Sequence, residues 1–293
     1  MEEGNFIVKN ILNRFKNIIL VIISGIVLIE LFMQLKFIAD ISKNLFINVA
    51  IILIVISIYG MFMKWVKSKD IINKKFFSSK KFSWKSNVSI IMLLYIFEIS
   101  LSNYFPNHSE NQNRIEEKES DMDLLTNIIS VSVSPAVIEE ICFRGIIYVI
   151  IFISSSLLIN LNRNYKYIAI TMFLIFSSVL FGFLHVAISY DFQNVGAYLV
   201  SGITFSIAYI LTRDIKVSIV IHALGNLFGV LYRNDMQYIS YLIIFVLLTV
   251  TLFCIKKIIN VVGGYGNYIE YKIKKARAKK ILKKDAEKRS VLQ

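Results

Sequence analysis

The chain has 293 residues, 56% of them hydrophobic, and its mean hydropathy is +0.63. A soluble domain contains about 45–50% apolar residues and lacks repeated apolar runs of about twenty residues, so composition excludes a soluble protein. The net charge of +13 gathers in a few loops and in the C-terminal segment. This pattern is typical of a membrane protein with cytoplasmic lysines rather than of a nucleic-acid-binding protein.

Residues that break helices are scarce, with two prolines and twelve glycines in the chain. The alternating segments of about ten residues that mark a transmembrane barrel are absent. The sequence therefore predicts an all-α, polytopic membrane helix bundle. Cys142 and Cys254 both lie in apolar segments. Each is most simply a small buried residue, a disulfide between them is the alternative, and no cysteine-rich metal pattern is present.

The first three predicted membrane helices cover about residues 18–38, 45–63 and 88–105. Between the second and third lies a lysine-rich segment, 64–85, which predicts a cytoplasmic loop and therefore a cytoplasmic N-terminus. Aromatic residues alternate with these lysines, so part of the loop is expected to rest on an anionic membrane surface. Residues 106–123 are acidic and predict a non-cytoplasmic loop, in which His108 is expected to be a surface histidine.

The fourth predicted span, 124–159, contains three charged residues, Glu139, Glu140 and Arg144. A charge at mid-membrane costs at least about 2.5–3.5 kcal/mol, so these side chains should lie in a protein interior and mark a functional site. In a helix, Glu140 and Arg144 share a face and can form an ion pair. Glu139 is rotated from Glu140 by about 100° and is left without a local counter-charge, so it can serve as a general base. The alternative is a buried network that only fixes helix packing.

Four further spans are predicted at about residues 167–189, 195–211, 217–231 and 239–255. The first of these carries Phe181 and His185, and the third carries His222 and Asn226, which are four residues apart and share a face. The structural alternatives to a functional role are that His185 is a buried, hydrogen-bonded core residue, and that His222 and Asn226 are a polar pair that joins helices. Glu139 lies mid-span, His185 near the outer end and His222 near the inner end. If the three meet, a predicted boundary is off by a turn or more.

Three motifs thus occur in a fixed order: Glu-Glu-x-x-x-Arg at Glu139, Glu140 and Arg144, Phe-x-x-x-His at Phe181 and His185, and His-x-x-x-Asn at His222 and Asn226. Each motif alone is weak, but the ordered set, with each motif in its own span, resembles the CAAX protease and bacteriocin-processing (CPBP or Abi) family of intramembrane proteases. The resemblance covers about residues 124–231, and eight helices with both termini cytoplasmic are similar to what this family shows.

The resemblance implies hydrolysis of a peptide bond inside the membrane. Glu139 would activate water with the help of His185, while His222 and Asn226 would stabilise the oxyanion. The structural supports would be Glu140, Arg144 and Phe181.

The family is also described as metalloproteases. Glu139, His185 and His222 are a common ligand set for catalytic zinc, with one position left for water. However, the sequence has no His-Glu-x-x-His motif, and Asn226 is a poor zinc ligand. The residues favour a glutamate-activated water with no cofactor required, and zinc remains the alternative.

Three regions are predicted: an N-terminal three-helix membrane region at 1–123, a catalytic membrane core at 124–258 and a basic cytoplasmic tail at 259–293. The tail is expected to lie on anionic lipid, with a solvated disordered tail as the alternative. The Lys, Ile and Asn bias suggests a bacterial plasma membrane. The expected partners are membrane lipids and a membrane-associated peptide or protein terminus, namely a bacteriocin, a pheromone or a CAAX-like substrate, and no nucleic acid.

Two other classes of function stay open at this point. A non-catalytic immunity or scaffold protein would keep its function after Glu139→Ala. A proton-coupled transporter would use Glu139 and the histidines as a proton relay, although the sequence shows no internal repeat and no paired broken helices.

Overall fold

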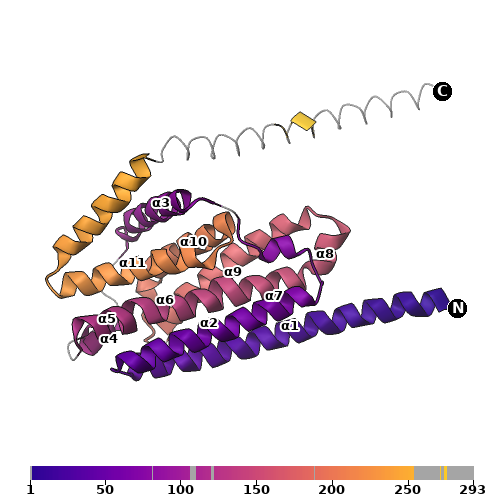
Figure 1. The fold of residues 1–293 in the computed structure, drawn as a ribbon, viewed down its shortest axis with the longest axis horizontal. Coiled ribbons are helices and arrows are strands. Elements are labelled where there is room, and N and C mark those ends of the chain that lie inside the picture. The colour runs from indigo at the N-terminus through magenta and orange to yellow at the C-terminus, as the bar shows by residue number, and fades with distance from the viewer. Residues whose placement is uncertain are drawn as a thin grey trace.

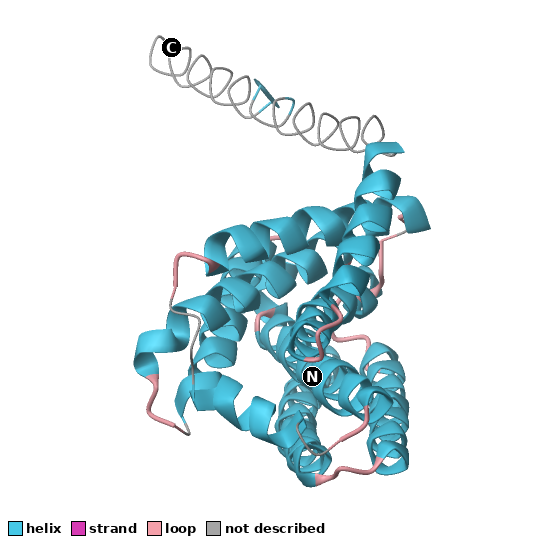
Figure 2. Cartoon of the chain, turned by 90° about the vertical axis from the view of Figure 1, so that its left-hand side faces the viewer, coloured by secondary structure: helices cyan, strands magenta, loops and turns pink. Residues whose placement is uncertain are grey.

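The computed structural model describes residues 2–80, 82–105, 110–119, 122–187, 189–253, 271, 274 and 275. Within these residues the chain forms helices joined by loops and turns, with no strand, which confirms the predicted all-α helical bundle (Figures 1 and 2). The long helices are α1 (Glu2–Ile41), α2 (Leu45–Ser68), α3 (Trp84–Ser102), α9 (Tyr165–Ala187), α10 (Val195–Thr212) and α11 (Ile215–Arg233).

In the described part of the chain, six helices are long and apolar enough to cross a membrane. They correspond to six of the eight predicted spans, and the protein is therefore a multi-pass membrane protein. The last predicted span appears as a shorter apolar helix, Gln237–Phe253. The count of eight and the orientation of the termini remain predictions.

The predicted fourth span is one helical run in which α-helix alternates with the wider π-helix. Its segments are α5 (Leu124–Asn127), η2 (Ile128–Val133), α6 (Ser134–Glu140), η3 (Ile141–Ile146) and α7 (Ile147–Ser154), followed by α8 (Ser156–Leu161). The two π-helical segments flank α6, which ends with both glutamates. Short π-helical insertions cost regular hydrogen bonding and are frequent at functional sites.

This run lies at the centre of the bundle. Figure 1 shows α6 and α7 in line between the α1–α2 pair and the α10–α11 pair, and α6 contacts α1, α2 and α11 directly. Two glycines permit close approaches between helices near this run. A Cβ at Gly145 would lie 2.8 Å from the Tyr59 ring of α2, and one at Gly202 would lie 2.9 Å from the carbonyl oxygen of Ser178 in α9. These glycines allow the neighbouring helices to press against the charged stretch.

The lysine-rich loop between α2 and α3 folds back against the protein. It contains the 3-10 helix η1 (Lys74–Phe77), in which Phe76 and Phe77 are buried and the Phe76 carbonyl accepts a hydrogen bond from Tyr148 Oη at 3.1 Å. Those two aromatic residues therefore do not face a membrane surface, which corrects part of the expectation for this loop. Trp84 remains exposed.

The acidic loop contains α4 (Glu110–Glu119), whose last residue forms a two-point ion pair with Arg233 at the end of α11. The remaining short helix is η4 (Phe192–Asn194), before α10. His108 lies outside the described residues, as do Cys254 and the predicted tail 259–293 apart from residues 271, 274 and 275. The proposed division of the chain into three regions stays a prediction.

Candidate active site

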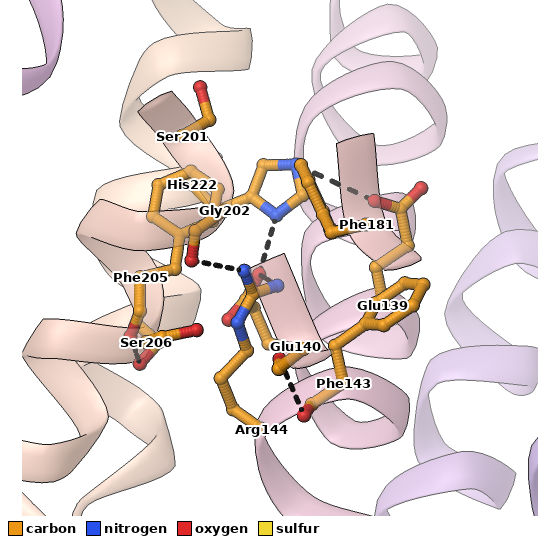
Figure 3. Close-up of polar contacts among 12 residues, drawn as sticks. Glu139, Glu140, Phe143, Arg144, Phe181, Ser201, Gly202, Phe205, Ser206 and His222 are labelled. Atoms are coloured by element: carbon orange, nitrogen blue, oxygen red, sulfur yellow. Dashed lines mark hydrogen bonds and ion pairs between the residues drawn. The ribbon is translucent and has the colours of Figure 1, made fainter. Parts of the chain in front are cut away.

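The innermost element of the site is the ion pair that the helical spacing predicts. Arg144 Nη1 donates to Glu140 Oε1 at 2.9 Å, and both side chains are fully buried (Figure 3). The second arm of the guanidinium, Nη2, donates to the backbone carbonyl of Gly202 at 2.8 Å. The guanidinium also lies over the rings of Phe181 and Phe205, 4.6 and 5.3 Å from their centroids. Arg144 therefore connects the charged run to α9 and α10.

Glu140 also orients His222 of α11. Glu140 Oε1 lies 3.0 Å from His222 Nδ1, and the imidazole stacks on the Phe205 ring with the centroids 4.8 Å apart. Since a carboxylate oxygen accepts, Nδ1 is the donor and carries a proton. The opposite nitrogen, Nε2, then faces Glu139, with 3.9 Å between it and Oε2.

His185 of α9 is held in an equivalent way. Its Nδ1 lies 2.7 Å from the backbone carbonyl of Phe181, one turn earlier, and its ring stacks on Tyr198 of α10 at 4.6 Å between centroids. A carbonyl can only accept, so Nδ1 again carries the proton. His185 Nε2 faces Glu139 Oε2 at 3.5 Å. The Phe-x-x-x-His spacing thus has a physical reason, because the carbonyl of its first residue fixes the ring of its last.

Glu139 lies where these groups converge. It is 4% exposed, and its Oε2 atom is buried without a hydrogen-bond partner among the described residues. The structure therefore brings together Glu139, His185 and His222, three of the four residues that the sequence assigns to catalysis. The fourth, Asn226, lies one turn beyond His222 on α11 and is partly buried. No hydrogen bond joins its side chain to another described residue.

Lys36 of α1 was not identified from the sequence, yet it contacts the site. Its Nζ lies 3.5 Å from Glu139 Oε1 and 2.8 Å from Asp40 Oδ2. The expectation that Glu139 lacks a local counter-charge holds for its own helix only, because a different helix supplies the cation. The available signal was a single lysine near the end of an apolar run, with an acid four residues later.

Glu98 of α3 is a further charged residue that the sequence reasoning missed. It is 9% exposed, and its Oε1 accepts a hydrogen bond from Ser201 Oγ of α10 at 2.6 Å. Ser201 directly precedes Gly202, whose carbonyl binds Arg144, so Glu98 reaches the same part of α10. Its second oxygen is buried without a partner among the described residues.

The residues were also tested as a metal site. Within the described part of the chain, no group of three or more His, Cys, Asp or Glu side chains is placed so that it could hold a metal ion. Moreover, a cation already lies beside the carboxylate, since the Lys36 ammonium is 3.5 Å from Glu139 Oε1. Metal dependence therefore stays a prediction, and no step proposed below uses a metal.

Comparison with known proteins gives a family for this part of the chain. Residues 121–228 match the family model for type II CAAX prenyl endopeptidase Rce1-like proteins. That segment contains all three motifs. Over these residues the chain is similar to the CAAX protease family. The chain is also 30% identical over 106 residues to the membrane-embedded CAAX protease MroQ of Staphylococcus aureus (strain USA300).

The similarity to MroQ covers 36% of this chain and 38% of MroQ, and no solved structure matches the chain. The CAAX protease segment begins just before α5 and ends within α11. Helices α1, α2 and α3 lie outside it, although α1 supplies Lys36 and α3 supplies Glu98. Contacts to the site therefore extend beyond the part of the chain that the comparison covers.

Proposed function

We propose that this protein is an intramembrane endopeptidase in which Glu139 activates a water molecule. The observation that carries the proposal is the unpartnered Glu139 Oε2 atom, faced by Nε2 of His185 at 3.5 Å and Nε2 of His222 at 3.9 Å. At these separations, one water molecule can lie about 2.8 Å from both the carboxylate and an imidazole, which is an ordinary hydrogen-bond length. Buried polar atoms that converge on one point in a protein interior are the expected setting for such chemistry.

The protonation of the two rings determines what each can do. In both neutral imidazoles Nδ1 carries the proton, so Nε2 is an acceptor. A water that donates one proton to Glu139 Oε2 and the other to His185 Nε2 keeps its lone pairs free to attack a carbonyl carbon. The new carbon–oxygen bond forms as Glu139 takes a proton. That proton then passes to the leaving nitrogen as the carbon–nitrogen bond breaks.

The developing oxyanion requires hydrogen-bond donors. His222 Nε2 can donate only when the ring carries a second proton in addition to the one on Nδ1. Asn226 needs no change of protonation, since its amide always offers two N–H donors. Its position one turn beyond His222 supports a role as the first donor, with His222 as the second. One donor of this kind is typically worth about 10²–10³ in kcat.

Glu140, Arg144 and Phe181 are proposed to act as supports. Glu140 fixes the His222 ring, Arg144 neutralises Glu140, and Phe181 contributes both a ring beneath the guanidinium and the carbonyl that fixes His185. None of these groups needs to touch the substrate. Their burial instead keeps the imidazoles in one orientation, and such preorganisation is the main contribution of the protein in electrostatic catalysis.

The substrate is proposed to be a membrane-associated peptide or protein terminus. The names of the matching family and of MroQ both refer to CAAX processing, which makes a lipidated C-terminal peptide the first probe. A bacteriocin leader or a peptide pheromone is the second choice for a protein of a bacterial plasma membrane. Membrane lipids are the other proposed partner, and the oligomeric state is left unassigned.

The test is cleavage by the purified full-length protein in detergent. The probes are quenched fluorogenic peptides with a geranylgeranylated or farnesylated cysteine near the C-terminus, and unlipidated leader peptides. Glu139→Gln, which keeps the shape and loses the base, is expected to lower kcat by at least about 10³-fold. The matched control is Glu30→Gln, because Glu30 lies in α1 and is exposed. Full activity of Glu139→Gln would exclude the proposed role of Glu139.

A further inference from the structure

α1 places a cation against the proposed base from outside the matched segment. Lys36 Nζ lies 3.5 Å from Glu139 Oε1, and the side chains are 23% and 5% exposed. α1 ends at Ile41, well before residue 121, where the similarity to the CAAX protease family begins. The comparisons therefore assign no role to Lys36. Its presence in an apolar helix needs a reason, because a charge in a membrane span is costly unless it is paired.

Among the residues that the structure describes, no other lysine or arginine is as well placed to pair with Glu139. Arg144 uses Nη1 for Glu140 and Nη2 for the carbonyl of Gly202, so its charge is engaged one residue further along the run. Among the described residues, Lys36 is the lysine or arginine within ion-pair distance of Glu139. An ionised carboxylate in such a buried position carries a large desolvation cost, which a nearby ammonium offsets.

The two oxygens of Glu139 have different surroundings. Lys36 faces Oε1, whereas both imidazoles face Oε2. If the ammonium holds Oε1, then the carboxylate cannot rotate freely and Oε2 stays directed at the two Nε2 atoms. The ammonium thus fixes which oxygen of Glu139 is presented to the imidazoles.

The contact is also suited to a base, because it is an ion pair without a tight hydrogen bond. At 3.5 Å, Lys36 Nζ is beyond an ordinary hydrogen bond to Glu139, whereas its 2.8 Å contact with Asp40 Oδ2 is a hydrogen bond. Asp40, four residues later on α1 and more exposed, therefore draws the ammonium away from the site. Attraction at this distance orients Glu139 while leaving its lone pairs available to accept a proton.

We propose that Lys36 is a positioning residue of the reaction, which holds Glu139 Oε1 so that Oε2 is presented to His185 and His222. The inference rests on the proposed function, since it concerns the residue assigned as base. It adds a residue of α1 to the catalytic arrangement and makes the first helix part of the enzyme rather than only a membrane anchor.

The kinetic test compares Lys36→Met with Lys36→Arg in the full-length protein, using the fluorogenic lipidated peptide. Lys36→Met is expected to lower kcat by about 10²-fold with KM changed less than about threefold, since a misplaced catalytic group costs about this much. Lys36→Arg, which keeps the charge, is expected to recover kcat to within about tenfold of the parent protein. The matched control is Lys16→Met, because Lys16 is an exposed lysine of the same helix. Parental kcat in Lys36→Met, or no recovery in Lys36→Arg, would overturn the proposal.

A second measurement needs no substrate. Thermal unfolding midpoints are compared for Lys36→Met, Glu139→Gln and the double variant. If the two side chains pair, the unfolding midpoint of the double variant will fall by less than the sum of the falls in the two single variants. Each single change leaves the other group without its partner, and the double variant counts that loss only once. Additive shifts would overturn the proposed pairing. Loss of activity in Lys36→Met together with full activity in Glu139→Gln would instead reject the proposed function.

Discussion

The buried ion pair between Glu140 and Arg144 leads to a prediction in which a variant keeps its stability but loses activity. Arg144 and Glu140 are both fully buried, with 2.9 Å between Nη1 and Oε1. Removing one partner of such a pair typically costs about 3–5 kcal/mol, because the remaining charge is left unpaired in the interior. Arg144→Met and Glu140→Leu are therefore each expected to lower the free energy of unfolding by about that amount.

The double variant Glu140→Leu/Arg144→Met removes both charges and keeps similar volumes. Replacement of a whole buried ion pair by apolar groups is often neutral or stabilising. The change also removes the donor to the Gly202 carbonyl, but a helix carbonyl of this kind still has its own backbone hydrogen bond. We therefore expect the double variant to unfold within about 3 kcal/mol of the parent protein, well below the sum of the two single changes. The remaining loss is that of two hydrogen bonds, one from Arg144 to Gly202 and one from His222 to Glu140.

Activity is expected to follow a different order. In the double variant His222 Nδ1 has lost Glu140, its hydrogen-bond acceptor at 3.0 Å. The ring is then free to change tautomer and orientation, and loss of the group that orients a catalytic histidine is severe in other hydrolases. A fall in kcat of at least about 10²-fold is expected despite near-parental stability.

The assay combines SDS-induced unfolding in mixed micelles, followed by tryptophan fluorescence, with cleavage of the lipidated peptide. If the double variant loses as much free energy of unfolding as the two single variants together, then the two charges do not stabilise each other. A stable double variant with parental kcat would refute the claim that Glu140 orients His222.

Three further outcomes are expected. Asn226→Ala should lower kcat by about 10²–10³-fold with an unchanged thermal midpoint, and a loss below about threefold would remove Asn226 from the oxyanion site. Gly145→Ala should lower the free energy of unfolding by about 1–3 kcal/mol, because the new Cβ would lie 2.8 Å from the Tyr59 ring. Gly60→Ala is the control and should not destabilise the protein, because a Cβ there would have nothing within 4 Å. Equal unfolding midpoints for the two variants would contradict the close packing at Gly145. EDTA should leave the cleavage rate unchanged, and loss of cleavage that zinc restores would make the imidazoles metal ligands.

The sequence predicted the helical elements well because apolar periodicity and length determine them. The helix α9 runs from Tyr165 to Ala187 against a predicted 167–189, and α11 runs from Ile215 to Arg233 against 217–231. The ion pair between Glu140 and Arg144 was predictable for a similar reason, since it depends only on spacing within one helix. These are local properties, and a single segment carries the whole signal.

Contacts between helices were predictable only where a motif marked both partners. Lys36 shows the limit, because nothing in the spacing of α1 indicates that its lysine meets a glutamate about a hundred residues later. Glu98 is a similar case, since its partner Ser201 is 103 residues away. The π-helical segments on either side of α6 were also not predicted, although Pro135 at the start of α6 indicates a disturbed helix at that point.

The mismatch in depth among the catalytic residues has a structural resolution. His185 lies two residues, or about 3 Å, from the end of α9, whereas Glu139 lies fifteen residues, or about 22 Å, from Leu124 at the start of its run. Both are at the same level, because His185 Nε2 is 3.5 Å from Glu139 Oε2. The boundaries of α9 and α11 differ from the predicted ones by only two residues, so the ends of these helices are staggered. The run from Leu124 and the helix α11 both extend well beyond the end of α9. The ion pair between Glu119 and Arg233 joins α4 to the C-terminal end of α11. The site thus lies near the ends of α1 and α9 but deep along α11 and along the run that begins at Leu124.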